Sequence, residues 1–458
     1  MTTAKATPPP SNKNPLLVAP VSTMIRKIGL PVAIGATFNT LFNVVDTIYG
    51  GLISDQALAA LSISFPIYFI IVALGFGFSQ GNTALIGNAL GRGNREEAEK
   101  YAIQGISFGI IISIITTVVV LPILPNLVAF MGATDPEYQR MALDYINMIF
   151  YGAIFFITVQ MLSSILNALG NTIPSRNFLV GGFFLNLLFD PWFIFGGFGL
   201  PPLGIAGIGL ATISIQALGC IYVGYFVAKT DLVTAVTLKK YLIPRANIVW
   251  RIIQQGLPNT LDLMGVSLGF FVLTFFVSKF GPNAVAALGA ASRLEQVALL
   301  PLLGLNVAVI SLVAQNNGAQ LYNRVQETFR KSIQYGSAIM LVTTVLVSLF
   351  ARPLMQLFTD DPEIIQIGVE YVWIRNLGLI PTAIFFMSSS ALRGIERPLL
   401  PLIYNMFRFV ILPWLFIIIF VQQMGMGLTA IWITSTSAFF ITAVVGYITA
   451  RRLLPQPN

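Results

Sequence analysis

The 458-residue chain is 56% hydrophobic and only 10% charged, and its mean hydropathy is +0.80. Soluble domains are typically about one-quarter charged, so this composition indicates a protein that crosses a membrane many times. The chain has no histidine, which removes the commonest metal ligand and proton carrier. Its single cysteine, Cys220, cannot form an intramolecular disulfide.

Apolar segments follow one another along the whole chain, and about 20 apolar residues suffice to cross a bilayer. We predict an all-α integral membrane protein of twelve transmembrane helices with approximate cores at 28–53, 58–90, 101–125, 139–168, 177–197, 205–228, 252–278, 284–313, 333–350, 364–391, 399–421 and 428–449. The polar, proline-rich start shows no cleavage pattern of a signal peptide, so the first apolar run is expected to stay as an anchor.

Basic residues are distributed unequally between the predicted loops. Of the 26 lysines and arginines, 20 fall on the side of the N-terminus, 3 on the other side, and 3 within spans. By the positive-inside rule both termini are expected in the cytoplasm, with the protein in the plasma (inner) membrane of a bacterium or archaeon. The same bias explains the net charge of +8 without nucleic acid as a partner.

The chain repeats itself at an offset of 227 residues, with Gly29–Pro31 falling on Gly256–Pro258. The offset drifts to 222 near the end of each half, where Pro191 falls on Pro413. A duplication kept only for packing is possible in principle, but two parallel six-helix repeats are typical of secondary transporters. The predicted organisation is a disordered tail (1–22), an N-lobe (23–228), a cytoplasmic linker (229–251), a C-lobe (252–450) and a cytoplasmic tail (451–458).

Two aspartates in the first half have no acidic counterpart in the second. The repeat places Asp46 on Leu273 and Asp190 on Leu412. A charge in the middle of a bilayer costs ~2.5 kcal/mol or more, so such residues are functional candidates by default. The alternative is that each aspartate only bonds a neighbouring helix.

Polar side chains accompany both aspartates at helical spacing. The set on the predicted faces of spans one, five and six is Asn39, Asn43, Asp46, Asn186, Asp190, Thr212 and Gln216. Pro191 should also free a backbone carbonyl next to Asp190. Oxygen donors suit a hard cation such as Na⁺, and two neighbouring carboxyl groups in a low dielectric favour binding a proton between them.

Other charges lie within predicted spans of the second half. Asp262, Arg293, Glu295, Arg375 and Arg408 are candidates either for a cavity or gate or for structural ion pairs. Arg293 and Glu295 are two positions apart, so they should point to different sides of a helix. The glycine-containing turn "GRGNREEA" lacks a phosphate-binding pattern, so we expect any transport to be driven by an ion gradient.

The stretches "NVVDTIYGG", "GNALGRGNREEA", "ALGNTIPS" and "NLLFDPWF" resemble the multidrug and toxic compound extrusion (MATE) transporters over about residues 25–450. The resemblance implies a two-lobe exporter, not an enzyme, that exchanges H⁺ or Na⁺ for cationic amphipathic drugs and needs no other cofactor. In DinF-like members the ion site lies in the N-lobe and maps onto Asp46, Asn186, Asp190 and Thr212. NorM-like members place an acid deeper in span seven than Asp262, which favours the DinF-like branch.

Two alternatives remain open at this point. Lipid-linked oligosaccharide flippases of the same superfamily have basic cavities, which Arg293, Arg375 and Arg408 could supply. An intramembrane aspartyl protease would also need two aspartates, but Asp190 lacks the preceding Gly-x-Gly of those enzymes. As partners we expect small amphipathic cations and membrane lipids, and we expect a monomer.

Overall fold

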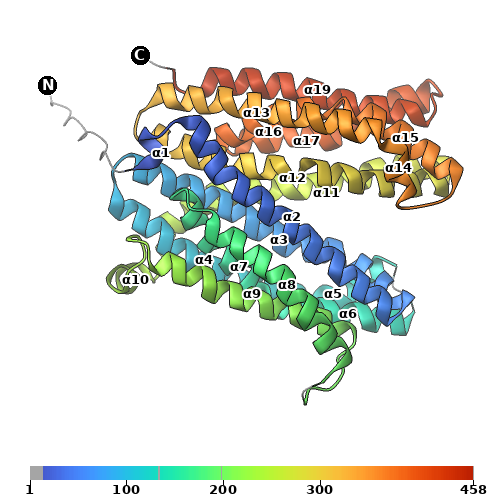
Figure 1. The fold of residues 1–458 in the computed structure, drawn as a ribbon, viewed down its shortest axis with the longest axis horizontal. Coiled ribbons are helices and arrows are strands. Elements are labelled where there is room, and N and C mark those ends of the chain that lie inside the picture. The colour runs from blue at the N-terminus through green and yellow to red at the C-terminus, as the bar shows by residue number, and fades with distance from the viewer. Residues whose placement is uncertain (1–13, 133–134, 198, 457–458) are drawn as a thin grey trace. The chain divides into compact units, whose positions relative to one another are not determined.

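The computed structural model describes residues 14–132, 135–197 and 199–456, and within this part of the chain it is helical throughout, without strands (Figure 1). The first half forms α1 (Pro15–Val18), α2 (Val21–Ile53), α3 (Asp55–Gly91), α4 (Arg95–Val120), α5 (Leu124–Phe130), α6 (Pro136–Tyr151), α7 (Ala153–Ala168), α8 (Ile173–Phe195), α9 (Ile205–Ala228) and α10 (Ala235–Tyr241). The second half forms α11 (Ala246–Val277), α12 (Pro282–Gly318), α13 (Tyr322–Leu349), α14 (Ala351–Gln356), α15 (Pro362–Asn376), α16 (Leu379–Gly394), α17 (Leu399–Met406), α18 (Leu412–Ile417) and α19 (Leu428–Leu453). Two π-helical segments, Phe407–Ile411 and Ile418–Gln423, flank α18.

The predicted all-α membrane fold class is confirmed. Among the described residues, ten helices are long and apolar enough to cross a membrane, and there are eleven spans if α6 and α7, bent by 44° at their junction, count as one. The remaining predicted span, 364–391, forms the pair α15 and α16. Gly152 separates α6 from α7 and Gly378 precedes α16, so both halves break this span at equivalent positions of the repeat.

The helices of the two halves begin at matching positions. The starts of α3 and α12 are 227 residues apart, as are those of α4 and α13 and those of α5 and α14. The starts of α6 and α15 are 226 apart. The two halves therefore contain the same succession of long and short helices, and the repeat in the sequence is also a repeat of structure.

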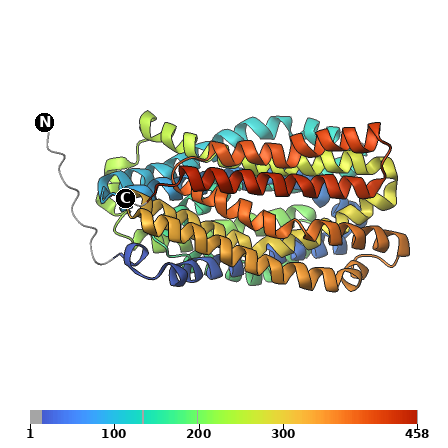
Figure 2. The same ribbon diagram turned by 90° about the horizontal axis from the view of Figure 1, so that it is seen from above.

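The chain forms two compact units whose boundaries cut through helices. One unit contains the described residues up to Ala33, then Leu90–Gly93, and the chain from Leu261 onward. The other contains Ile34–Ala89 and Asn94–Thr260. The long helices within each unit lie side by side (Figures 1 and 2). The lobe and linker boundaries at 23–228, 229–251 and 252–450 stay predictions.

Residues 14–22, which were predicted to belong to a disordered tail, form α1 and the start of α2. Asn14 caps α1 and its Nδ2 donates to Gln315 Oε1 at 2.6 Å. Arg324 Nη2 donates to the carbonyl oxygen of Ala19 at 2.7 Å, and Leu16 is buried. These contacts come from residues some 300 positions later, which composition of the segment alone does not reveal. The rest of the predicted tail, 1–13, lies outside the described residues.

Glycines that the repeat aligns stand at close helix crossings. A Cβ at Gly77 of α3 would lie 2.4 Å from the backbone nitrogen of Thr260 in α11. A Cβ at Gly304 of α12 would lie 2.2 Å from the carbonyl oxygen of Gly29 in α2. Small residues let backbones approach closely in membrane proteins, and here the same crossing is built once in each unit.

We expect Gly77→Ala to destabilise the protein by about 1–3 kcal/mol, because a methyl group there overlaps backbone atoms that cannot rotate away. Gly181→Ala in α8 is the matched control, since no heavy atom lies within 4 Å of its added Cβ. The measurement is the midpoint of thermal unfolding of the detergent-purified variants. Equal midpoints for the two variants would contradict the close crossing.

Candidate functional site

The polar cluster predicted on spans one, five and six forms within the unit that contains Ile34–Ala89 and Asn94–Thr260. Asp46 of α2, Asn186 and Asp190 of α8, and Thr212 of α9 are all buried, with at most 7% of each residue exposed. Asn186 Nδ2 donates a hydrogen bond of 2.9 Å to Asp46 Oδ1. Asp190 lies one turn further along α8, and its carboxyl group interacts electrostatically with that of Asp46.

A proline opens the backbone next to this cluster. Pro191 has no N–H to donate to the carbonyl of Leu187, four residues earlier in α8. The hydroxyl of Tyr49, three residues after Asp46 on α2, instead approaches the Leu187 oxygen at 3.5 Å. Thus α2 and α8 are joined both by the Asp46–Asn186 bond and by a weaker contact to the carbonyl that Pro191 leaves open.

The unsatisfied atoms of the cluster are oxygens. Asn186 Oδ1, both carboxylate oxygens of Asp190 and Gln216 Oε1 are buried without a hydrogen-bond partner among the described residues. Thr212 Oγ1 donates to the carbonyl of Ile208 at 3.0 Å, which leaves its own lone pairs free to accept. Leaving a buried polar group unpaired costs about 1–3 kcal/mol, so such a group of acceptors calls for a proton or a cation.

No described residue forms an ion pair with Asp46 or Asp190. The resemblance implies no resident metal, and within the described chain no group of three acidic, histidine or cysteine side chains could hold one. The donor set of carboxylate, amide and hydroxyl oxygens fits Na⁺ or a shared proton by its chemistry. This cluster is the candidate functional site.

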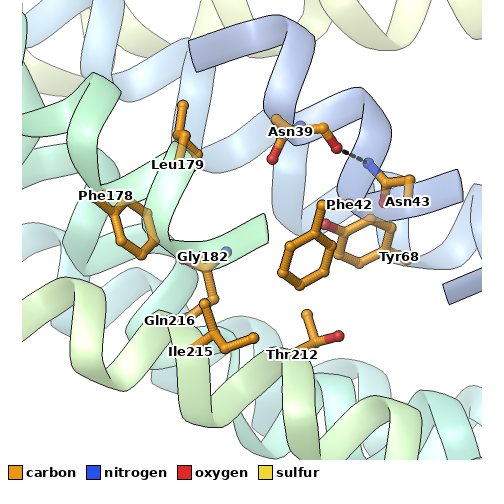
Figure 3. Close-up of a pocket in the computed structure, with 10 residues that line it drawn as sticks. All are labelled: Asn39, Phe42, Asn43, Tyr68, Phe178, Leu179, Gly182, Thr212, Ile215 and Gln216. Atoms are coloured by element: carbon orange, nitrogen blue, oxygen red, sulfur yellow. Dashed lines mark hydrogen bonds between the residues drawn. The ribbon is translucent and has the colours of Figure 1, made fainter. Parts of the chain in front are cut away.

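A narrow cleft shares Thr212 with the cluster (Figure 3). Its lining comes from α2, α3, α8 and α9 and consists of Asn39, Phe42, Asn43, Tyr68, Phe178, Leu179, Gly182, Thr212, Ile215 and Gln216. Within it Asn43 Nδ2 donates to the carbonyl oxygen of Asn39 at 2.8 Å (Figure 3). The predicted residues Asn39, Asn43 and Gln216 therefore line the cleft, and Thr212 belongs to both the cleft and the cluster.

Two tyrosines near the carboxylates were not predicted. Tyr68 of α3 interacts electrostatically with Asp46, and Tyr145 of α6 with both Asp46 and Asp190. The repeat offered a signal for Tyr145, since it aligns with Tyr371, whose hydroxyl donates to Glu295 Oε2 at 2.9 Å. Each half thus places an equivalent tyrosine beside an acid, which is buried in the first half and half-buried in the second.

The candidates from the second half lie in the other unit. Asp262 of α11 is buried, pairs with Arg393 of α16 and accepts a hydrogen bond of 2.6 Å from Asn405 Nδ2. Glu295 accepts from Arg375 Nε at 3.1 Å. Arg293, two residues away on α12, is exposed, so the two side chains do point to different sides. Asp262 and Glu295 therefore form structural ion pairs. This is one of the two roles predicted for them, the other being a cavity or gate.

We expect Asp262→Asn to destabilise the protein by roughly 3–5 kcal/mol, because it leaves the Arg393 guanidinium buried without its carboxylate. Asp46→Asn removes a carboxylate that has no cationic partner, so its unfolding midpoint should be unchanged or higher. Thermal unfolding of both variants in detergent gives the comparison. A lower midpoint for Asp46→Asn than for Asp262→Asn would reverse the assignment of the two aspartates.

Two repeats of membrane-spanning helices, with a polar cluster buried inside one of them, define a multi-pass membrane protein of the transporter type. Residues 31–192 and 258–419 each match the family model MatE, and the two matches are offset by the 227 residues of the repeat. The chain belongs to the MatE family of multidrug efflux transporters.

Individual relatives align over most of their length. The chain is 27% identical over 412 residues to a probable multidrug resistance protein NorM from Thermotoga maritima, covering 89% of this chain and 87% of the relative. It is 25% identical over 403 residues to an FAD transporter from Shewanella oneidensis, covering 88% of each. A solved MOP superfamily transporter from Pyrococcus furiosus Vc1 superimposes with a TM-score of 0.90 at 26% identity, covering 97% of this chain and 98% of that one.

Proposed function

We propose that the protein is a secondary active exporter that exchanges H⁺ or Na⁺ for cationic amphipathic compounds by alternating access. The observation that carries the proposal is the set of buried, unpaired oxygens around Asp190 and Asn186, beside Asp46 and an aromatic cleft. Relatives named as multidrug resistance and multidrug export proteins support the choice of substrate. We further propose that both termini lie in the cytoplasm, that the membrane is the plasma membrane, and that the exporter works as a monomer.

Asp46 and Asp190 carry the coupling ion in this proposal. Asn186 fixes one oxygen of Asp46, and Thr212 supplies a further oxygen, as the resemblance to the DinF-like branch implies. In our proposal Asn43 adds another oxygen. Each pH unit supplies about 1.4 kcal/mol per proton, and 100 mV supplies ~2.3 kcal/mol per charge moved. The ion can drive the cycle only through a different affinity for the inward-open and outward-open states.

The cleft supplies the substrate contacts in this proposal. Phe42, Tyr68 and Phe178 present aromatic rings, and Asn39 and Gln216 add amide groups. Aromatic faces attract flat cations by about 0.5–2 kcal/mol each. Because Asp46 is one turn along α2 from Asn43, an ion bound there can change the charge that a cationic substrate meets.

We expect Asp46→Asn and Asp190→Asn each to lower the initial rate of ethidium efflux at least tenfold in cells that lack their own exporters. The reason is that neither amide can bind a proton or replace the charge that a cation requires. Asp55→Asn, at the exposed start of α3, is the matched control and should keep the normal rate. Full activity of both cluster variants at equal expression would overturn the proposed coupling site.

The coupling ion is expected to stabilise the wild-type protein when it binds the folded state. At 100 times its dissociation constant a ligand adds about 2.7 kcal/mol to the free energy of unfolding. Unfolding midpoints should therefore rise with Na⁺ at fixed pH, or with acidification at fixed K⁺, and Asp46→Asn should abolish whichever response occurs. Neither response in the wild type would contradict ion binding at the cluster.

The structure supports the flippase alternative with fewer of the three arginines than the sequence offered for a basic cavity. Arg293 is exposed on α12 and Arg375 is paired with Glu295, so of the three arginines only Arg408 is buried without an acidic partner. Transport of a fluorescent lipid-linked saccharide in proteoliposomes would distinguish this activity from efflux of a cation.

A further inference from the structure

The position that corresponds to Asn186 holds an arginine in the second half of the chain. With the offset of 222 that aligns Pro191 and Pro413, Asn186 falls on Arg408 and Asp190 on Leu412. One half therefore places an acid and an amide where the other places an arginine and a leucine.

Arg408 lies in the π-helical segment Phe407–Ile411, and none of its surface is exposed. Its Nη2 donates to Thr382 Oγ1 at 2.5 Å, whereas its Nε and Nη1 have no hydrogen-bond partner. It forms no ion pair with any residue that the structure describes. A guanidinium stays protonated in proteins, so this is a buried positive charge. Glu295 and Asp262 act on it electrostatically, but each of these acids is paired with another arginine, Arg375 or Arg393.

Aromatic rings surround this charge. The Cζ atom of Arg408 lies 3.7 Å from the ring centre of Phe439 and 4.8 Å from that of Phe385. Arg375 Cζ lies 3.6 Å from the centre of the same Phe439 ring. Because both guanidinium groups lie so close to the ring centre, they must occupy opposite faces of the Phe439 ring. A cation–π contact with one ring stabilises the charge by up to about 2 kcal/mol, whereas burying an ion costs several kcal/mol. The rings therefore compensate the desolvation cost of Arg408 only in part.

The unpaired buried nitrogens near Arg408 are donors. Besides Arg408 Nε and Nη1, they include Nη1 of Arg375, whose guanidinium packs on the same Phe439 ring. Two buried oxygens on the neighbouring helical segments, Asn405 Oδ1 and Thr436 Oγ1, are also without a partner among the described residues, but a neutral amide or hydroxyl oxygen cannot balance the charge of a guanidinium.

Charge and surroundings limit what can satisfy these donors. The charge of Arg375 is compensated by Glu295, so one net positive charge remains at Arg408. A monovalent anion balances it, whereas a doubly charged phosphate would leave an excess negative charge among aromatic rings. We propose that Arg408, with Arg375 on the same aromatic ring, forms a binding site for a monovalent anion, either a halide from solution or the carboxylate of a transported compound. This goes beyond the proposed cation exchange, which does not require it.

The test measures equilibrium binding of radiolabelled chloride and of benzoate to the purified wild-type protein in gluconate buffer. We expect one saturable site per chain for at least one of the two probes. Arg408→Gln should weaken that binding at least tenfold. Arg293→Gln, which removes an exposed arginine of the same half, should leave it unchanged.

The probes separate the two sources of the anion. Binding of chloride indicates a solution ion, whereas binding of benzoate without chloride indicates the acidic group of a cargo. Saturable binding of neither, or equal binding by the wild type and Arg408→Gln, would overturn the proposal. If Arg408→Gln does not fold, crystals of the wild type grown in bromide and in a bromobenzoate decide the matter: an anomalous peak next to Arg408 is required from at least one of the two.

The same binding measurement on Asp46→Asn keeps this proposal separate from the exchange function. Asp46 lies in the other unit, so we expect anion binding by this variant within a factor of two of the wild type. Loss of efflux with unchanged anion binding would support both sites independently. Loss of anion binding in Asp46→Asn would contradict a self-contained site around Arg408.

Discussion

The cost of burying a charged or polar group without a partner shapes this structure more than any single contact. In a hydrocarbon environment such groups cannot form hydrogen bonds with water, so each one must bond another group of the protein or bind an ion or ligand. The pairs Asp262–Arg393 and Glu295–Arg375 meet this requirement within the protein. Asp190 forms no ion pair with any described residue, and its two unpaired oxygens are the reason for proposing that an ion binds there.

The internal repeat shows how one scaffold carries two different sets of polar side chains. Both halves use similar helix lengths, the same glycine crossing and a tyrosine beside an acid. The side chains at equivalent positions then differ. Asp46 and Asp190 align with leucines of the second half, and Asn186 aligns with Arg408. A proline follows both Asp190 and Leu412, so the local opening of the helix was kept while the charge changed sign.

Much of the fold and part of the site follow from local patterns. Hydropathy predicts the spans, and the spacing of Asn186 and Asp190 on one helix face predicts that they act together. Contacts between segments far apart in the sequence could not be predicted from such local patterns. The partner of Asp262 is Arg393, 131 residues later, and nothing in the composition of either span indicates that pairing. Tyr68 was missed for the same reason, because it reaches Asp46 from another helix.

The helical turn around Arg408 marks a second limit of prediction. An arginine in an apolar span has many possible partners, and the π-helical geometry that directs it toward Phe439 depends on packing against α16 and α19. Residues 14–22 show the reverse case: they were predicted to continue the polar, proline-rich tail, yet Asn14 and Ala19 bond side chains of the second half. In both cases tertiary contacts decide the outcome.

The interleaving of the two units has a consequence for biosynthesis. Leu16, Val21 and Ile28 pack in one core with Leu302 and Met387, so these three residues become buried only after much later segments of the chain have been synthesised. The other unit is complete only when the residues up to Thr260 have been made. A gene cut between the two repeats would therefore yield two fragments that each lack a helix segment supplied by the other, and co-expression rather than separate production would be required to reassemble them.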